Sequence, residues 1–524
     1  MRITGENLTI RGVEDIAINR AQVELDQGQL GMVAEACERI QRWGREGHPI
    51  YGVTTGFGEL VYKSIPVKFE SELQENLLRS HAAAAGDRFP DDVVRAILAA
   101  RLNCLMKGYS GISVDAVRLM ATFLNRQIHP VVPQQGSLGA SGDLAQLSHL
   151  ALPLIGAGQV SYQGQVREAS TVLAETGLDR VELGYKDGLA LINGTSAMTG
   201  VAALALRRAQ RLLRLALWAS AAFVQVMRGS TGAYQERGHV LKNHVGQMAV
   251  ASAMRASLRG GKLTRTHDEV MREIAATSGL DSGEVVDSST YLQNAYTLRC
   301  VPQILGPVYD AIQYCQRIVE EELNSCNDNP LIFDSPATIF HGGHFHGQYV
   351  AMASDFLNIA IAEIGVLAER QLNRVLDPHL NPHYPEFLAS SGEAGLYCGL
   401  EGAQYLATSL ASENLSLTSP ASIKSIPSNG QNQDVVSMGL IAARRSLQLT
   451  DHVHTILSVL VAACYQAAMV TGLEQFSPSV SKPMRLLSER VTPYQDDAVV
   501  GVFLATIRDA LRDEKFSEQL PEIN

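Results

Sequence analysis

The tripeptide Ala140-Ser141-Gly142 has the residue types that can build an electrophile from the polypeptide backbone. Glycine has no Cβ, so the amide nitrogen of Gly142 can fold back onto the carbonyl carbon of Ala140 without the steric cost that other residues meet. Ring closure with loss of water gives a five-membered imidazolone, and loss of the Ser141 hydroxyl as a second water leaves an exocyclic methylidene. None of the twenty side chains supplies such an electrophile well, so the tripeptide predicts a cofactor made by the chain itself.

The residues around the tripeptide place it at the start of a helix. Asp143 and Leu144 begin an apolar run that ends near Ile155, and a turn from Pro130 to Pro133 precedes it. The partial positive charge at a helix N-terminus favours electron density arriving on a ring at this point. An Ala-Ser-Gly sequence by itself is common in glycine-rich loops, so the wider context has to decide its role.

The nine residues from Gly136 to Leu144, followed by Ser148-His149-Leu150, resemble the signature of the aromatic amino acid ammonia-lyases and aminomutases. In that family the tripeptide becomes 4-methylidene-imidazol-5-one (MIO), which the resemblance implies for Ala140-Ser141-Gly142. At least six blocks match the family in order from Tyr51 to Asp434. The resemblance implies an all-α fold, a large multi-helix bundle with a smaller loop-rich N-terminal part.

A glycine-rich stretch from Pro49 to Leu60 contains the candidate base. It predicts a loop with three glycines at which hinges can sit. Within it, Tyr51 opens the run Tyr-Gly-Val-Thr-Thr-Gly-Phe-Gly, which matches the catalytic loop in which the family's tyrosine acts as base. The chemistry removes a β-proton from an unactivated carbon, and a phenolate held near the prosthetic group suits this role if the pKa of Tyr51 is lowered.

Other blocks carry residues to which the resemblance assigns contacts with the substrate or the ring. His81 would contact the far end of the aromatic ring of the substrate and offer a hydrogen-bond partner to a phenol. Arg299 would hold the substrate carboxylate in a bidentate pair, and Asn193 would donate hydrogen bonds to the oxygen of the MIO ring. Phe345 would lie against that ring, and Tyr296 would bring a second hydroxyl to the reacting carbon. The remaining expected site residues are Tyr291, Gln293, Tyr405, Glu413 and Gln433.

Three histidines, His341, His344 and His346, lie within six residues and raise the alternative of a metal site. A metal site needs a fourth ligand and suitable geometry, neither of which follows from the sequence. In the family this block places Phe345 against the prosthetic ring and binds no metal, so we expect none here.

The combined blocks most resemble the bacterial tyrosine 2,3-aminomutases of the family. They span Gly56 to Tyr62, Ser80 to Ala83, Tyr291 to Tyr296 and Gln404-Tyr405. The resemblance implies conversion of L-tyrosine into β-tyrosine through p-coumarate for natural-product biosynthesis. Retention of p-coumarate needs a closed lid, which the sequence does not reveal. Tyrosine ammonia-lyase is therefore the alternative, phenylalanine or histidine fits less well, and a catalytically dead helical scaffold is a hypothesis of another class.

Composition limits the possible partners and compartment. A hydrophobic content of 46% with 19% charged residues is typical of a soluble globular protein. The net charge of −11 argues against nucleic acid or an anionic membrane as partner. Seven cysteines without a Cys-x-x-Cys pair favour free thiols, and the N-terminal residues lack a secretory signal. The most apolar stretch, 201–227, carries four arginines and predicts a bundle helix. We therefore expect a cytoplasmic enzyme.

Long amphipathic or apolar runs predict the helices that must position these residues. They cover 197–228, 305–325, 347–376, 400–417, 436–471 and 493–512, and Pro90 to Met106 predicts a further helix. We expect an N-terminal part at 1–196 with the tyrosine loop and the tripeptide, a long-helix bundle at 197–475 and a C-terminal helical segment at 476–524. The resemblance also implies a homotetramer with active sites built from several subunits.

Overall fold

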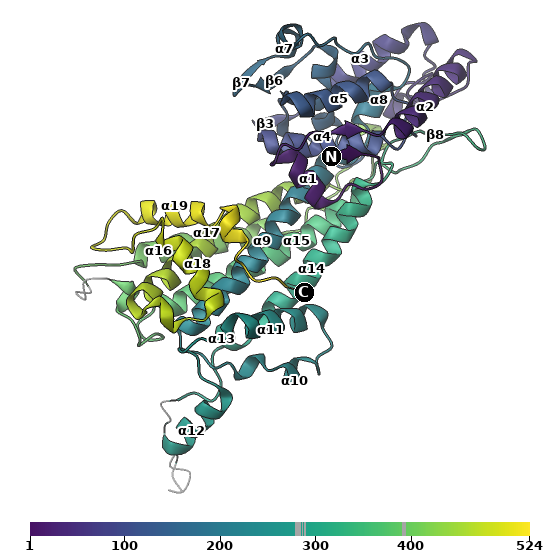
Figure 1. Ribbon diagram of the computed structural model, residues 1–524. Helices are drawn as coiled ribbons and strands as arrows, with labels where there is room; N and C mark the ends of the chain where they lie inside the picture. The colour runs from purple at the N-terminus through teal and green to yellow at the C-terminus, as the bar shows by residue number, and fades with distance from the viewer. Residues whose placement is uncertain (278–284, 286, 288–289, 390–394, 524) are drawn as a thin grey trace. The chain divides into compact units, whose positions relative to one another are not determined.

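The computed structural model describes residues 1–523 except 278–284, 286, 288, 289 and 390–394 (Figure 1). About 60% of it is helical, so the predicted all-α fold is confirmed. The helices are α1 Ile10–Ala17, α2 Gln27–Arg45, α3 Glu70–His81, α4 Asp91–Leu105, α5 Val114–Arg126, α6 Leu144–Ala151, α7 Ala169–Thr176, α8 Asp187–Ile192, α9 Ser196–Val226, α10 Glu236–His239, α11 Val245–Leu258, α12 His267–Thr277, α13 Tyr296–Arg299, α14 Val301–Leu323, α15 Gln348–Leu376, α16 Glu401–Leu417, α17 Gly439–Thr471, α18 Pro478–Ser488, α19 Val500–Ala510 and α20 Glu514–Ser517.

The described strands are short and pair in sheets of two or three strands. They are β1 Arg2–Ile3, β2 Glu24–Leu25, β3 Ala85–Arg88, β4 His129–Pro130, β5 Pro133–Gln135, β6 Gln159–Tyr162, β7 Gln165–Glu168, β8 Leu331–Phe333 and β9 Thr338–Phe340. Strands β3 and β5 are antiparallel, with Ala85 opposite Gln135. This pairing joins the chain that leaves α3 to the chain that enters the tripeptide.

The predicted long helices are present, with two boundaries in error. The helix predicted to start at 305 begins at Val301. The last of the predicted helices begins at Val500, although the sequence indicated a start at 493. Residues 493–499 instead form a turn in which the Tyr494 hydroxyl donates to the carbonyl of Ala498 at 2.8 Å. Asp496 and Asp497 there have positive φ, which a continuing helix does not allow.

The chain divides into two compact units, each made of several segments. Unit 1 comprises Met1–Arg207, Tyr314–Leu357 and Ser419–Leu447, and unit 2 comprises the remaining residues. The boundaries predicted at 196 and 475 stay predictions.

The centre of unit 1 is α4, whose residues from Val93 to Leu105 are all buried. It packs against α1 and α5. The Arg95 guanidinium donates to the carbonyls of Ile16 (2.7 Å) and Leu124 (2.7 Å), which caps the chain ends of those two helices. Close by in the sequence, α6 packs against α3 and α8. Figure 1 shows the short strands β6 and β7 beside α7 at the margin of this unit. The helices α3, α6 and α8 carry or adjoin the candidate site residues of unit 1.

Two described helices, α15 and α17, are long and apolar enough to cross a membrane by length and composition alone. Within their apolar windows, 72% and 78% of the residues are buried in the protein. Core helices of globular proteins have the same property, so this observation is weak evidence for a membrane span.

Candidate active site

The tripeptide forms a tight turn directly before α6. Ser141 and Gly142 both have positive φ, +53° and +70°. The Gly194 amide donates to the Ser141 carbonyl at 3.3 Å, and the Asp143 amide donates to the Gly194 carbonyl at 2.8 Å. A Cβ at position 142 would collide with that Gly194 carbonyl. Position 142 therefore accepts only glycine, and the turn fits the backbone cyclisation that the sequence predicts.

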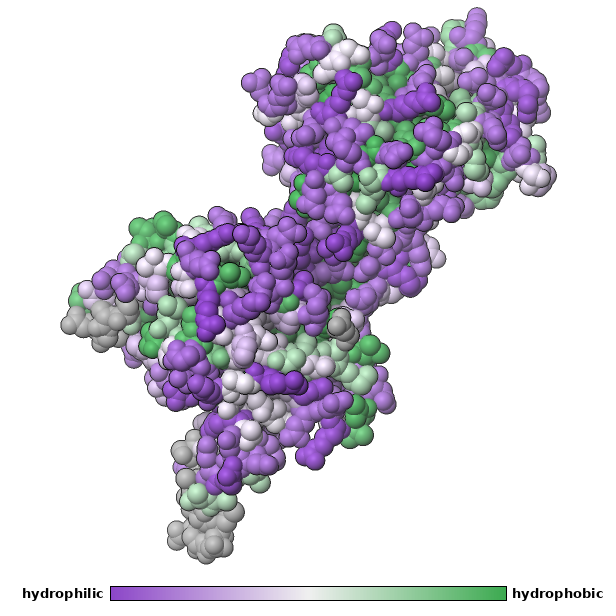
Figure 2. All heavy atoms as spheres, viewed as in Figure 1, coloured by the Kyte–Doolittle hydropathy of each residue, from purple (hydrophilic) through white to green (hydrophobic). Residues whose placement is uncertain are grey.

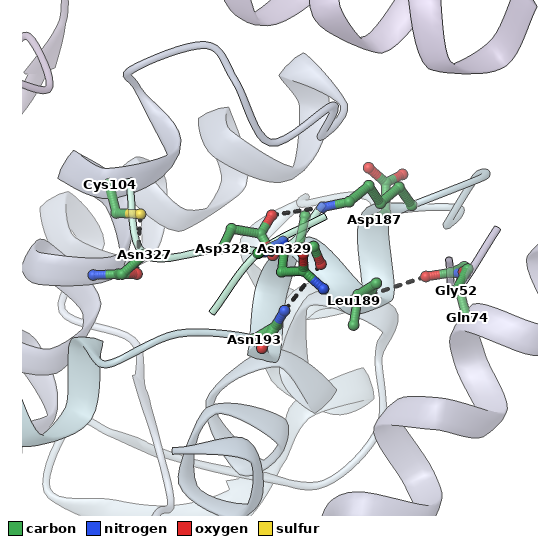
Figure 3. Close-up of polar contacts among 12 residues, drawn as sticks. Gly52, Gln74, Cys104, Asp187, Leu189, Asn193, Asn327, Asp328 and Asn329 are labelled. Atoms are coloured by element: carbon green, nitrogen blue, oxygen red, sulfur yellow. Dashed lines mark hydrogen bonds and ion pairs between the residues drawn. The ribbon is translucent and has the colours of Figure 1, made fainter. Parts of the chain in front are cut away.

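Asn193 caps the C-terminus of α8 and directly precedes Gly194. It lies beside the tripeptide because the Gly194 backbone is hydrogen-bonded to Ser141 and Asp143. Its Nδ2 donates to the carbonyl of Asn329 at 3.0 Å, as Figure 3 shows. Its Oδ1 is buried and has no hydrogen-bond partner among the described residues. A buried, half-satisfied amide next to the tripeptide is suited to bind a polar group that forms there.

A buried polar network holds the end of α8 in place (Figure 3). The Arg101 guanidinium, from α4, donates to the Asn193 carbonyl at 2.9 Å and to the Asn327 Oδ1 at 3.0 Å. The Lys186 ammonium pairs with the Asp328 carboxylate at 2.6 Å, and both side chains are fully buried. Loss of one partner from such a pair costs about 3–5 kcal/mol because the other charge stays buried. The network therefore strongly constrains the backbone at Asn193.

A second buried carboxylate, Asp143, links the tripeptide to the start of α9. The Ser137 hydroxyl donates to it at 2.6 Å, and the Met198 amide donates to it at 2.7 Å. Burial raises the pKa of Asp143 to about 6, although both bonds oppose this shift. A negative charge at the N-terminus of α9 is favourable, which helps to keep this group ionised at neutral pH.

Tyr51 lies in the predicted loop, before the 3-10 helix η1 (Gly58–Tyr62). Its hydroxyl accepts a hydrogen bond from the Gly58 amide at 2.8 Å, and its ring meets the Phe57 ring edge-on at 6.4 Å. Burial raises the pKa of the phenol above its usual value, and the Gly58 bond only partly opposes this. The lowered pKa that the base role was expected to require is therefore not found in these surroundings, because burial disfavours the charged phenolate.

His81 ends α3, which packs against α6. Its Nδ1 lies 3.1 Å from the Leu77 carbonyl and 3.0 Å from the Ser80 hydroxyl. A carbonyl can only accept, so the Leu77 contact is a hydrogen bond in the tautomer with the proton on Nδ1. Burial lowers the pKa of His81, which keeps the ring neutral near pH 7 and leaves Nε2 as an acceptor.

Two further predicted residues lie on segments that are hydrogen-bonded to the tripeptide turn or to the residues just before it. The Gln433 amide donates to the Ser141 hydroxyl at 3.1 Å. Phe345 is half-buried and lies two residues before Gly347, whose amide donates to the Gly139 carbonyl at 3.2 Å. Unit 1 therefore brings Ser141, Asn193 and Gln433 together and places Phe345 on an adjoining segment.

The other predicted residues, apart from those described above, belong to unit 2. The Arg299 guanidinium lies over the Tyr296 ring at 4.9 Å, and its Nε is buried without a hydrogen-bond partner in the described part of the chain. The Tyr405 hydroxyl donates to Glu401 at 2.7 Å. The exposed residues among them are Tyr291, Gln293, Tyr296, Tyr405 and Glu413. Their roles stay predictions.

The three histidines of the alternative metal site have separate surroundings. The Tyr51 amide donates to His341 Nε2 at 3.5 Å, and His344 packs on the Phe340 ring at 5.1 Å. His346 donates to the Val435 carbonyl at 3.1 Å. Within the described residues, no three His, Cys, Asp or Glu side chains gather as metal ligands would.

The sequence analysis missed Gln74, Arg101 and the segment 327–329. Gln74 occupies the same buried face of α3 as Leu77 and Leu78, and Arg101 interrupts the apolar face of α4. A polar residue at a core position of a helix is the signal that would have found both, since such side chains are buried only with partners.

The helical fold and the turn at 140–142, which requires glycine at 142, are the features with which the comparisons with known proteins can be set beside this chain. Residues 8–489 match the family described as aromatic amino acid lyase, to which this chain belongs. The chain is 60% identical to a tyrosine 2,3-aminomutase of Chondromyces crocatus over 99% of this chain and 98% of that protein. It is 46% identical to a tyrosine ammonia-lyase of Cupriavidus metallidurans, covering 93% and 92%. The crystal structure of a tyrosine aminomutase from Streptomyces globisporus matches with a TM-score of 0.95 and 42% identity, covering 100% and 99%.

Proposed function

We propose that this chain is a tyrosine 2,3-aminomutase that converts L-tyrosine into β-tyrosine through p-coumarate. The observation that carries the proposal is the 60% identity to a tyrosine 2,3-aminomutase over almost the whole of both chains. The turn at Ala140-Ser141-Gly142, which only glycine at 142 can form, supports it independently.

The residues of the chain divide the work of this reaction. The MIO group made from Ala140-Ser141-Gly142 supplies the electrophile for the substrate amine. Tyr51 removes the β-proton. The Arg299 guanidinium, whose Nε has no hydrogen-bond partner among the described residues, is suited to the substrate carboxylate. Asn193 and Gln433 stabilise charge with their amide groups. No step requires a metal ion.

The alternative is a tyrosine ammonia-lyase, which the relative from Cupriavidus metallidurans represents. The two activities share every step up to p-coumarate and differ in whether this product escapes. The distinction depends on closure of the Tyr51 loop over the site, since a closed site retains the acrylate until the amine adds back at the β-carbon.

A time course with L-tyrosine tests the proposal. Separation of β-tyrosine from p-coumarate at early times is expected to show β-tyrosine as the main product, with p-coumarate as a minor leak. Formation of p-coumarate alone would instead make the chain an ammonia-lyase.

We propose that His81 selects tyrosine by accepting a hydrogen bond from the phenol of the substrate at its Nε2. Its Nδ1 already contacts the Leu77 carbonyl and the Ser80 hydroxyl, so Nε2 is the nitrogen that remains to accept. The His81→Phe variant is expected to lower the kcat/KM ratio of tyrosine to phenylalanine by about tenfold, the value of one hydrogen bond in a dry site. Competition assays with both amino acids measure it, and an unchanged ratio would remove His81 from the specificity.

We further propose a homotetramer in which several chains contribute to each active site. Tyr349, Met352 and Phe356 follow one face of α15 and are exposed, Tyr349 by 72%. Figure 2 shows hydrophobic surface also at α19, where Val499 and Val502 are exposed. Apolar surface of this kind marks protein interfaces. Analytical ultracentrifugation is expected to give the mass of four chains, and the mass of one chain would contradict the proposal.

We also propose that the enzyme works in the cytoplasm, without a metal, a membrane or nucleic acid as partner. The net charge of −11 and seven cysteines that are all free thiols support this setting. Turnover is expected to survive dialysis against a chelator.

A further inference from the structure

We propose that Gln74 is a positioning residue that fastens the Tyr51 loop to α8, and that this attachment sets how much p-coumarate escapes. The inference rests on the proposed aminomutase function. It concerns a residue that neither touches the tripeptide nor belongs to the predicted site.

Gln74 joins the loop and the helix through one side chain, as Figure 3 shows. Its Nε2 donates to the Gly52 carbonyl at 2.8 Å, and its Oε1 accepts from the Leu189 amide at 2.9 Å. The side chain is fully buried. Both hydrogen bonds are thus made to backbone groups that water does not reach, so their loss is costly.

The two backbone groups belong to the Tyr51 loop and to α8, the helix that precedes Asn193. Gly52 follows Tyr51 directly, and the Leu189 carbonyl accepts the amide of Asn193 at 2.9 Å. The loop also lies directly on the helix: a Cβ at Gly52, which has a φ of +70°, would lie 2.6 Å from the Leu189 side chain. Gln74 therefore couples the position of the base to the helix that carries Asn193.

The far end of the loop is held by exposed contacts. No residue of η1 is buried, and η1 packs against the short helix η6 (Asn429–Gln431). A segment whose contacts are exposed opens more readily than one with buried hydrogen bonds. Gly52 and Val53 are buried instead, Val53 in a cluster with Ile50 and Ile332. This end of the loop is therefore the anchored one, and Gln74 adds a buried side-chain hydrogen bond to it from another element.

The Gln74→Met variant keeps the approximate size of the side chain and removes both hydrogen bonds. The open form of the loop is then expected to gain about fivefold in population per hydrogen bond lost. An open loop releases p-coumarate before the amine adds back. The initial ratio of p-coumarate to β-tyrosine should therefore rise at least about fivefold over wild type.

The matched control is Asn103→Leu. Asn103 is a fully buried amide that accepts from the Gly5 amide at 3.0 Å. It donates to the Leu323 carbonyl at 2.9 Å and to the Asn324 Oδ1 at 3.1 Å. Its loss removes the same kinds of bond from unit 1 without touching the loop. The control is expected to lower Tm and to leave the product ratio unchanged.

A second variant, Gln74→Glu, gives a readout that a loss of stability does not produce. A protonated glutamic acid can donate to Gly52 and accept from Leu189 as glutamine does, whereas the carboxylate cannot donate. Burial raises the pKa of such a carboxyl group. The product ratio of this variant, relative to wild type at each pH, is expected to match wild type at acidic pH and to rise with pH.

Limited trypsin digestion at the exposed Lys63, just after η1, measures loop opening without any turnover. Faster cleavage in Gln74→Met than in Asn103→Leu, with a raised product ratio, supports the proposal. Equal cleavage rates and a wild-type product ratio in both Gln74 variants would overturn it. If the wild-type chain makes no β-tyrosine, the aminomutase function fails, whereas the cleavage rates still decide the role of Gln74 in the loop.

Discussion

Replacement of Ser141 by alanine is expected to lower turnover of L-tyrosine at least about 10³-fold. The electrophile needs all three residues of the tripeptide, so loss of one of them removes the whole group. Alanine has no hydroxyl to lose as water, so the exocyclic methylidene cannot form. The turn itself should persist, since its hydrogen bonds to Gly194 are made by the backbone. Initial rates, together with the circular dichroism spectrum and Tm, measure both parts of the expectation.

The control for this variant is Ser161→Ala. Ser161 is a buried serine of β6 whose hydroxyl donates to Asp91 at 3.0 Å, away from the tripeptide. It is expected to retain activity. Substantial turnover by a folded Ser141→Ala chain would show that the reaction does not use this tripeptide.

The Tyr51→Phe variant is expected to lose about 10²- to 10⁴-fold in kcat, the usual contribution of a general base. Phenylalanine keeps the ring contact with Phe57 and removes only the hydroxyl. The matched control is Tyr62→Phe, which makes the same change at an exposed tyrosine of η1. A small loss in Tyr51→Phe, no larger than in Tyr62→Phe, would exclude Tyr51 as the base.

The pH dependence of the wild-type enzyme follows from the same residue. A base acts in its deprotonated form, and burial raises the pKa of Tyr51 above its ordinary value of about 10. The phenol is therefore mostly protonated at neutral pH, and kcat/KM is expected to increase with pH from 7 to 9. A plateau already at pH 7 would mean that the assembled enzyme lowers this pKa with groups from outside the loop.

The helices could be predicted because long apolar runs need no knowledge of their partners. The apolar periodicity of α9, α14, α15 and α17 extends over many turns, and each of these helices lies where the sequence indicated. The turn at 493–499 was harder to predict. Pro493 resembles a helix start, but Asp496 and Asp497 have positive φ, and the Asp497 carboxylate accepts from the amides of Cys398 (2.6 Å) and Gly399 (2.9 Å). Periodicity does not describe such distant contacts.

Much of the candidate site followed from residue types within the tripeptide and the matching blocks, whereas its supporting network did not. Arg101 is paired with Asn327, and Lys186 with Asp328, across 226 and 142 residues of sequence. Whether a charged side chain is buried depends on such distant partners. The sequence alone does not show which residues the fold brings together, so it does not reveal which charges are buried. The direction of the Tyr51 pKa shift has the same origin, because burial sets it.

The most direct test of the whole account is the mass of the peptide that contains residues 140–142, taken from the purified wild-type chain. If Ala140-Ser141-Gly142 forms MIO, we expect this peptide to be lighter than its encoded residues by two water molecules, with no such change in the other peptides. The Ser141→Ala chain serves as reference, since it cannot lose the second water. A wild-type peptide with the full encoded mass would contradict the account and leave the chain as a helical scaffold without its electrophile.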